Sequence, residues 1–187
     1  MIQFLRDREL TKRISPFLQK GWSLLDIGTG RGTMALLLRQ QVGVEPTLTD
    51  VVNQNQTDLP WVNMISNARV DVADKSFDAV SLIFVLHHVQ TKQEQEKLIQ
   101  EAARIARKRI VILEDTPNSK ISWLMNAAWD WIMNAPKGIP VPFNFRSKKE
   151  WQELFDKTGL NAKAYSFRPF WPVMLTYQQT LFVIDLI

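Results

Sequence analysis

Short apolar runs alternate with amphipathic stretches along most of this chain. The runs have the length of strands, and they are predicted at residues 23–27, 46–49, 61–65, 77–84, 109–113, 160–166 and 180–187. The stretches between them carry apolar residues three or four positions apart, which predicts helices at about 4–18, 33–41, 92–106 and 147–159. Strands that alternate with helices favour an α/β fold with a doubly wound, mainly parallel sheet.

Residues 117–142 interrupt this alternation with a stretch rich in tryptophan. Apolar residues recur there at helical spacing, while further tryptophans extend the apolar surface around the other side. The residues concerned are Ile121, Leu124, Met125, Ala128 and Ile132, and then Trp123, Trp129 and Trp131. Such a helix is buried, covers a pocket as a lid, or lies at an interface. We expect one domain over residues 1–187, with a Trp-rich lid or cap insertion at about 117–146.

Composition limits the chemistry that the chain can perform. The 187 residues include no Cys, which excludes disulfides and thiolate metal sites. No apolar run has the length of a membrane span, and the charged N-terminus does not resemble a signal peptide, so we expect a cytoplasmic protein. The net charge of +4 leaves peripheral membrane contact open. We interpret the basic residues at 104–109 and 148–149 as solvated surface.

Residues 24–33, Leu-Leu-Asp-Ile-Gly-Thr-Gly-Arg-Gly-Thr, join a predicted strand to a predicted helix. Glycines in such a turn let the backbone approach a ligand closely. A dinucleotide fingerprint would require Gly or Ala where Thr33 stands, and the carboxylate of Asp26 would repel a phosphate at the helix N-terminus. A ligand that carries an ammonium and a sulfonium would instead be attracted.

At this point the chain resembles the class I S-adenosylmethionine-dependent methyltransferases. Asp26, Gly28, Gly30 and Gly32 match the acid-x-Gly-x-Gly-x-Gly motif of that family. The resemblance implies S-adenosylmethionine as cofactor and a Rossmann-like sheet of seven strands in the order 3-2-1-4-5-7-6, with the last strand antiparallel.

Further cofactor contacts follow from the sheet and from the resemblance. Asp50 ends the second predicted strand, where an acid beside the glycine loop accepts hydrogen bonds from ribose hydroxyls. The resemblance implies that Asn67 accepts from the adenine amino group, although the family commonly has an acid there, and that the Ala68 amide meets the adenine ring. We interpret Asp78 as fixing local backbone. The resemblance places the remaining contacts at Thr29, Val51 and Ile83.

Two adjacent histidines, His87 and His88, follow the fourth predicted strand. Neighbouring residues are expected to point to different sides, and no third ligand stands at usable spacing, so we predict no metal site. If the acceptor needs a general base, Asp115 at the tip of the fifth strand and His88 are the predicted catalytic residues, with Glu114 and His87 as alternatives.

The predicted function is methyl transfer from S-adenosylmethionine to a small, partly apolar molecule by in-line displacement. Aromatic side chains in the Trp-rich segment, with Phe143, Phe145, Phe170 and Trp171, would wall the acceptor pocket, unless they belong to the core. Three alternatives remain: an RNA methyltransferase, suggested by the basic charge, a non-enzymatic S-adenosylmethionine-binding module, and a nicotinamide oxidoreductase. The RNA alternative lacks an Asn-Pro-Pro-Tyr-type motif after the fourth strand, so nucleic acid is not the expected partner. Oligomeric state cannot be predicted.

Overall fold

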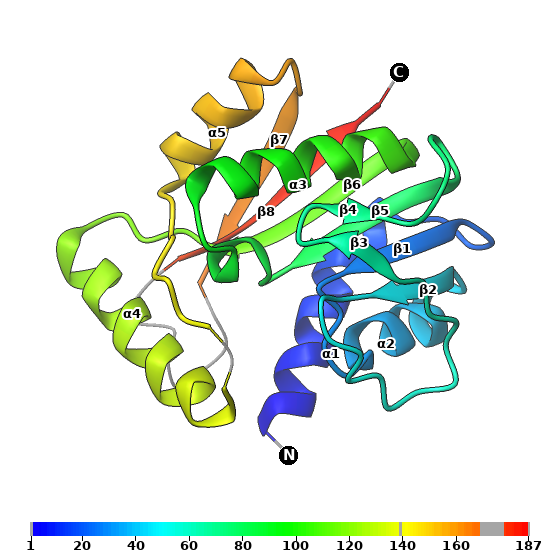
Figure 1. Cartoon of the computed structure of the whole chain (residues 1–187). Helices are drawn as coiled ribbons and strands as arrows, with labels where there is room; N and C mark the ends of the chain where they lie inside the picture. The colour runs from blue at the N-terminus through cyan, green and yellow to red at the C-terminus, as the bar shows by residue number, and fades with distance from the viewer. Residues whose placement is uncertain (1, 139, 169–177, 187) are drawn as a thin grey trace.

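The computed structural model of the chain describes residues 2–138, 140–168 and 178–186, and it shows a doubly wound α/β fold (Figure 1). Six strands form the main sheet in the order β2-β1-β5-β6-β8-β7. They are β1 (Ser23–Ile27), β2 (Glu45–Thr49), β5 (Phe77–Ile83), β6 (Ala106–Asp115), β7 (Ala162–Phe167) and β8 (Gln179–Asp185). Strand β8 runs antiparallel to both of its neighbours, and the other pairs are parallel. The predicted topology is therefore confirmed.

The predicted number of seven strands is wrong, because the expected third strand at 61–65 does not join the sheet. One parallel bridge, between Leu48 and Trp61, is all that links this segment to the edge of β2 in the described chain. Strand β3 (Met64–Ser66) pairs instead with β4 (Arg69–Val70), and the two form a separate antiparallel hairpin. Glu101 fixes this hairpin by accepting a hydrogen bond of 2.9 Å from the buried amide of Val70.

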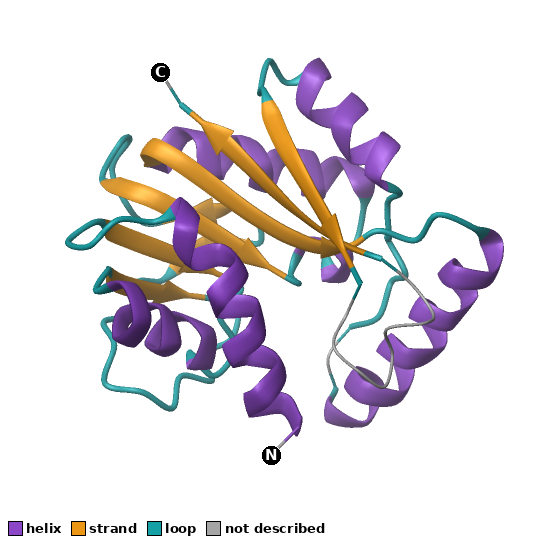
Figure 2. Ribbon diagram, turned by 180° about the vertical axis from the view of Figure 1, so that it is seen from behind, coloured by secondary structure: helices purple, strands orange, loops and turns teal. Residues whose placement is uncertain are grey.

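Helices cover both faces of the sheet (Figure 2). Helices α1 (Ile2–Ile14) and α2 (Thr33–Val42) pack on one face, against a core that includes Leu24, Val111 and Val183. Helices α3 (Lys92–Ile105) and α5 (Lys148–Lys157) pack on the other face, against a core that includes Ile110, Ile112 and Phe182. Neighbouring strand residues thus serve opposite cores, as expected for strands buried on both faces.

Helix α4 (Lys120–Asn134) follows β6 and has its polar side turned inward. Ser122, Asn126 and Asp130 are its buried residues, one turn apart. Its large apolar residues are exposed instead: Ile121, Trp123, Leu124, Met125, Trp129, Trp131, Ile132 and Met133. The sequence correctly predicts a helix here, but its apolar residues do not enter the core. Three short 3-10 turns complete the described elements. They are η1 (Ser15–Phe17) before β1, η2 (Leu86–His88) before α3 and η3 (Ala135–Lys137) directly after α4.

Candidate active site

The glycine loop leaves the tip of β1 and is tied to the tip of β2. The amide of Gly28 donates to the Thr49 carbonyl at 2.9 Å, and Gly28, Gly30 and Gly32 all have positive φ angles. A side chain at Gly28 would collide with Val85, and one at Gly32 with Leu48, so these two glycines allow close packing. A side chain at Gly30 would meet no atom of the described residues within 4 Å. The loop therefore packs against the protein at Gly28 and Gly32 and faces open space at Gly30. A ligand can approach the backbone closely at Gly30, and we call this open part of the loop the cradle.

Asp26 lies directly before this loop and is 3% exposed. Its Oδ1 accepts a hydrogen bond of 2.6 Å from the Ser81 hydroxyl of β5. Burial raises the pKa of Asp26 to about 6, although the Ser81 hydrogen bond opposes this change. A carboxylate kept in such surroundings gains most from a neighbouring cation, which agrees with the ammonium partner that the motif predicts.

Asp50 reaches across from the tip of β2 to the glycine loop, as the sequence predicts. Its Oδ2 accepts from the Gly30 amide at 2.9 Å, and its Oδ1 accepts from the Val51 amide at 2.7 Å. Each carboxylate oxygen keeps a further lone pair, so ribose hydroxyls can still donate to it.

The other predicted cofactor contacts lie at the same edge or on the β3–β4 turn. Thr29 is in the glycine loop, where its amide donates to the Thr49 carbonyl at 3.3 Å, and Ile83 ends β5. Asn67 and Ala68 form the turn between β3 and β4, where Asn67 is exposed. The Ala68 amide has a long contact of 3.4 Å with the Ser66 hydroxyl, which leaves it able to meet a better acceptor.

Asp78 lies at the opposite end of β5 and fixes backbone, as the sequence predicts. Its Oδ2 accepts from the amide and the hydroxyl of Ser23, both at 3.1 Å. Arg107 and Lys108 form ion pairs with its Oδ1.

The turn η2 carries the two histidines and lies beside the glycine loop. The residue before this turn, Val85, packs directly against Gly28. Glu114, fully buried at the end of β6, accepts from the Leu86 amide at 2.7 Å and from His87 Nδ1 at 2.6 Å. Burial lowers the pKa of His87, but the attraction of Glu114 outweighs it and raises the pKa to about 9. The surroundings of His87 therefore favour positive charge.

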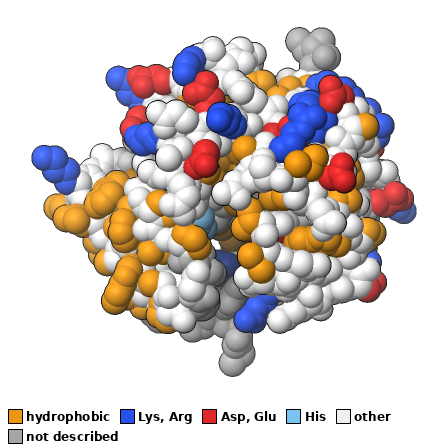
Figure 3. Space-filling model, in the orientation of Figure 1, with side chains coloured by type: hydrophobic (Ala, Val, Ile, Leu, Met, Phe, Trp, Pro, Cys, Tyr) orange, Lys and Arg blue, Asp and Glu red, His pale blue; other side chains and the backbone are white. Residues whose placement is uncertain are grey.

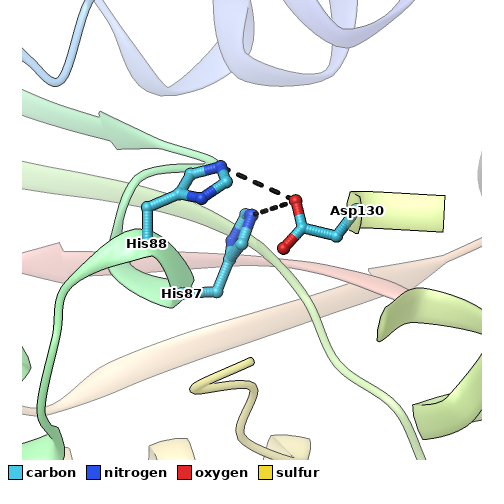
Figure 4. A group of neighbouring side chains, drawn as sticks. All are labelled: His87, His88 and Asp130. Carbon is cyan, nitrogen blue, oxygen red and sulfur yellow. Dashed lines mark ion pairs between the residues drawn. The ribbon is translucent and has the colours of Figure 1, made fainter. Parts of the chain in front are cut away.

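The two histidines do not point to different sides, and on this point the sequence prediction is wrong. Both lie on one tight turn, with ring centroids 4.2 Å apart. The Nε2 atoms of both rings lie 3.9 Å from the same oxygen, Oδ1 of Asp130 (Figure 4). Asp130 comes from the inner side of α4, which places it beside the histidines despite the long separation in sequence. Sequence reasoning missed Asp130, although polar residues every fourth position within an apolar helix mark a polar inner face.

Asp115, the other predicted catalytic residue, ends β6 and is partly exposed. Removal of the carboxylate from water raises the pKa of Asp115 to about 6. The positive charge of His87 and the hydrogen bond from Gln179 lower this pKa, but by less. That hydrogen bond, of 2.9 Å from Nε2 of Gln179, occupies Oδ1 of Asp115. A carboxylate with such a pKa is suited to accept a proton near neutral pH.

Aromatic side chains lie next to this group of titratable residues. The Phe145 ring stacks on His87 at 5.1 Å, and Trp123 packs edge-on against Phe143 and Phe145. Trp123 and Phe145, together with Pro117, line an open cavity of about 490 Å³ at the start of α4. Phe170 and Trp171, also predicted to wall a pocket, lie outside the described residues.

Fold and site together define a class I S-adenosylmethionine-dependent methyltransferase. The chain belongs to the methyltransferase domain family, whose match covers residues 3–164. S-adenosylmethionine is its cofactor, and the open cradle above Gly30 between Asp26 and Asp50 fits that molecule. The predicted family, enzyme class and cofactor are thereby confirmed.

Solved structures share the fold at low sequence identity. A chain from a complex between the Haloferax volcanii Trm112 methyltransferase activator and a methyltransferase is 16% identical, with a TM-score of 0.75 over 98% of this chain and 90% of that one. A methyltransferase from Methanosarcina mazei is 16% identical, with a TM-score of 0.71 over 92% and 96%. One from Archaeoglobus fulgidus is 16% identical, with a TM-score of 0.70 over 96% and 94%. Among curated proteins, none matches this sequence.

Proposed function

We propose that the protein methylates a small, partly apolar molecule that binds between the glycine loop and α4. The observation that carries the proposal is the composition of the space beside η2. The Phe145 ring stacks on His87, and Trp123 packs against Phe143 and Phe145. The open cavity that Trp123 and Phe145 help to line has the size of a small-molecule site. An acceptor with one polar and one apolar end suits both parts of this surface.

The chain's own residues mainly position the acceptor. The sulfonium of bound S-adenosylmethionine supplies an activated methyl group, so the protein has to align a nucleophile behind it and exclude water. Asp115 is the proposed proton acceptor for a hydroxyl or amine, because its pKa is about 6 and it lies two residues before the cavity wall at Pro117. His88, the second predicted catalytic residue, is proposed to orient the polar end of the acceptor.

Pairing of the basic residues argues against the RNA alternative. Arg104 contacts Glu101 and Asp74, and Arg109 contacts Asp185. Arg107 and Lys108 both contact Asp78, so the basic run at 104–109 is matched by acids. A nucleic-acid surface would need these charges free to meet phosphates.

A labelled-methyl screen tests the proposal. The protein is incubated with S-adenosylmethionine labelled in the methyl group and with separated pools of small metabolites, lipids and RNA, and label is followed by mass spectrometry. We expect label in a small-molecule or lipid fraction, and about 100-fold slower turnover for Asp115→Asn with unchanged S-adenosylhomocysteine affinity. Label confined to RNA would contradict the proposal. Cofactor binding with no labelled product would favour the binding module, and binding of NADH the oxidoreductase.

We also propose that the outer side of α4 touches a membrane surface, from which an apolar acceptor would enter. No helix among the described residues is long and apolar enough to cross a membrane. The exposed side of α4 nevertheless presents Leu124, Trp131 and Ile132, each more than half exposed. Hydrophobic side chains gather over this helix, at the left of Figure 3. Its one acid, Asp130, is buried on the inner side, while Lys120 and nearby Lys148 and Lys149 are exposed. Tryptophan and aliphatic residues bordered by lysines are typical of helices that lie on anionic lipid.

A further inference from the structure

We infer that His87, His88 and Asp130 form a binding site for a divalent transition-metal ion. One ligand atom from each, two imidazole nitrogens and a carboxylate oxygen, lies within 4.8 Å of the others. The expectation that no metal binds rested on diverging histidines and a missing third ligand, and the geometry removes both reasons. The inference goes beyond the proposed function and does not depend on which acceptor is methylated.

The hydrogen bonds of the two rings fix which nitrogens are free. His88 Nδ1 lies 3.0 Å from the carbonyl oxygen of Pro140, which can only accept, so Nδ1 of His88 carries the proton. His87 Nδ1 is bonded in the same way to the Glu114 carboxylate at 2.6 Å. In the neutral rings both Nε2 atoms therefore keep their lone pairs, and both are directed at Asp130 (Figure 4). Metal-binding histidines are held in this manner, with the second nitrogen donating to a carboxylate or carbonyl.

The distances favour an ion over direct hydrogen bonds. Each Nε2 is 3.9 Å from Asp130 Oδ1, too far for a hydrogen bond. Asn134 donates a hydrogen bond of 2.6 Å to Oδ1 of Asp130, which keeps further lone pairs for an ion. A bound ion would replace the proton that His87 carries on Nε2, so the positive charge that Glu114 and Asp130 favour there would be kept. Ligands of a tetrahedral zinc ion lie about 3.3 Å apart, so each Nε2 atom has to approach Oδ1 of Asp130 by about half an ångström.

Unpartnered polar atoms on α4 give a second, independent indication. Oδ2 of Asp130 and both polar atoms of the Asn126 side chain are buried without a hydrogen-bond partner in the described chain. These residues are 6% and 3% exposed, respectively. Buried polar groups normally have partners, and an ion with its bound water would supply them here. Three protein ligands also leave a coordination position for water or for an oxygen of the acceptor, so His88 would orient the acceptor through the ion.

The composition of the chain makes the test specific. His87 and His88 are the only histidines in the sequence, so any imidazole ligand must come from them, and the absence of cysteine excludes a thiolate ligand. The full chain, purified without a histidine tag and stripped with a chelator, is titrated with Zn²⁺ by calorimetry. Long-range ¹H–¹⁵N spectra then follow the two rings. We expect one Zn²⁺ per chain, with both Nε2 signals shifted and both Nδ1 protons retained.

Variants separate this site from incidental binding. Asp130→Asn and His88→Gln keep size and polarity, and each should weaken Zn²⁺ binding roughly 100-fold. Asp156→Asn removes an exposed acid of α5 and should leave it unchanged. No binding by the wild type, or equal binding by Asp130→Asn and His88→Gln, would overturn the inference. Circular dichroism verifies that the variants fold, and S-adenosylhomocysteine binding is measured in the same samples, so a failed metal site is distinguished from a failed cofactor site.

Discussion

The site at the carboxyl edge of the sheet has two ends, one formed mostly by backbone atoms and the other by side chains. Beside β1 and β2 the surface is mostly backbone, with positive-φ glycines and amides that Asp50 holds in place. Beside β5 and β6 it consists of titratable side chains from η2, β6 and α4. A backbone surface requires particular residues close together in sequence, whereas a side-chain surface is assembled from distant segments. The first kind is therefore visible in a motif, and the second only in the fold.

Filling the space above Gly30 should give the largest effect, because it affects the backbone surface directly. Gly30→Ala adds a methyl group where no atom of the described chain lies within 4 Å, so we expect the methyl group to displace the ligand. We expect the affinity for S-adenosylhomocysteine to fall at least about 100-fold in calorimetric titration, because the added methyl group occupies space that the ligand would fill.

Gly21→Ala is the matched control for that substitution. Gly21 also has a positive φ angle and open space around its Cα, but it lies at the other end of β1. Both variants should lose a similar 1–2 kcal/mol of stability from left-handed strain. Equal loss of ligand affinity in both would mean that strain, not occupancy, explains the result.

Replacing Asp26 should separate stability from binding. Its pKa is raised from 3.8 to about 6, so this group stabilises the fold while protonated, fully below pH 3.8, and that stabilisation is lost as the pH rises through 6. Asp26→Asn removes the ionised form, and we expect about 1–3 kcal/mol of added stability at pH 8 but weaker cofactor binding. Urea unfolding from pH 4 to pH 8 measures the first effect. A stability difference that does not shrink toward pH 4 would contradict the assigned cause.

The sequence predicted the glycine loop and the two acids beside it, because the determinants of this half of the site are local. Gly28, Gly30 and Gly32 specify the turn, and Asp26 and Asp50 each stand at a strand tip that the apolar pattern identifies. The third strand was predicted wrongly, because the apolar residues at 61–65 do not reveal that Val70 and Glu101 draw the chain into a hairpin. Cross-strand and helix contacts of this kind depend on the assembled fold.

The half of the site beside α4 could not be predicted, because α4 buries polar residues and exposes its large apolar ones. Ile121 and Leu124 predict a buried apolar side, yet they are 72% and 62% exposed, and Asp130 is inside. Hydrophobic spacing identifies a helix but not which side faces the protein when a polar site lies beneath it. His88 and Asp130 are 42 positions apart, so their contact follows from the docking of α4.

Asn126 offers a test of that polar inner side at a smaller scale. Its side-chain amide is buried and has no partner in the described chain, which costs about 1–3 kcal/mol if no ligand compensates. Asn126→Leu keeps the number of heavy atoms and the branching of the side chain, and it should therefore raise the free energy of unfolding of the metal-free protein by about 1 kcal/mol. A loss of more than about 1 kcal/mol would show that the amide is already satisfied and that the inner side is not a ligand surface.

A substitution on the outer side of α4 should change membrane binding and leave stability almost unchanged, which is the reverse of the result expected for Asn126. Leu124→Glu alters a side chain that is 62% exposed, so stability should change by less than about 0.5 kcal/mol. Binding to vesicles that contain anionic lipid should fall about 5- to 10-fold in a sedimentation assay, since an apolar anchor becomes an acid. Ile65→Glu, at a residue 66% exposed on the β3–β4 hairpin, should leave vesicle binding unchanged. If both variants, or neither, lose vesicle binding, α4 is not the lipid surface, and the proposed entry of an apolar acceptor from a membrane is contradicted.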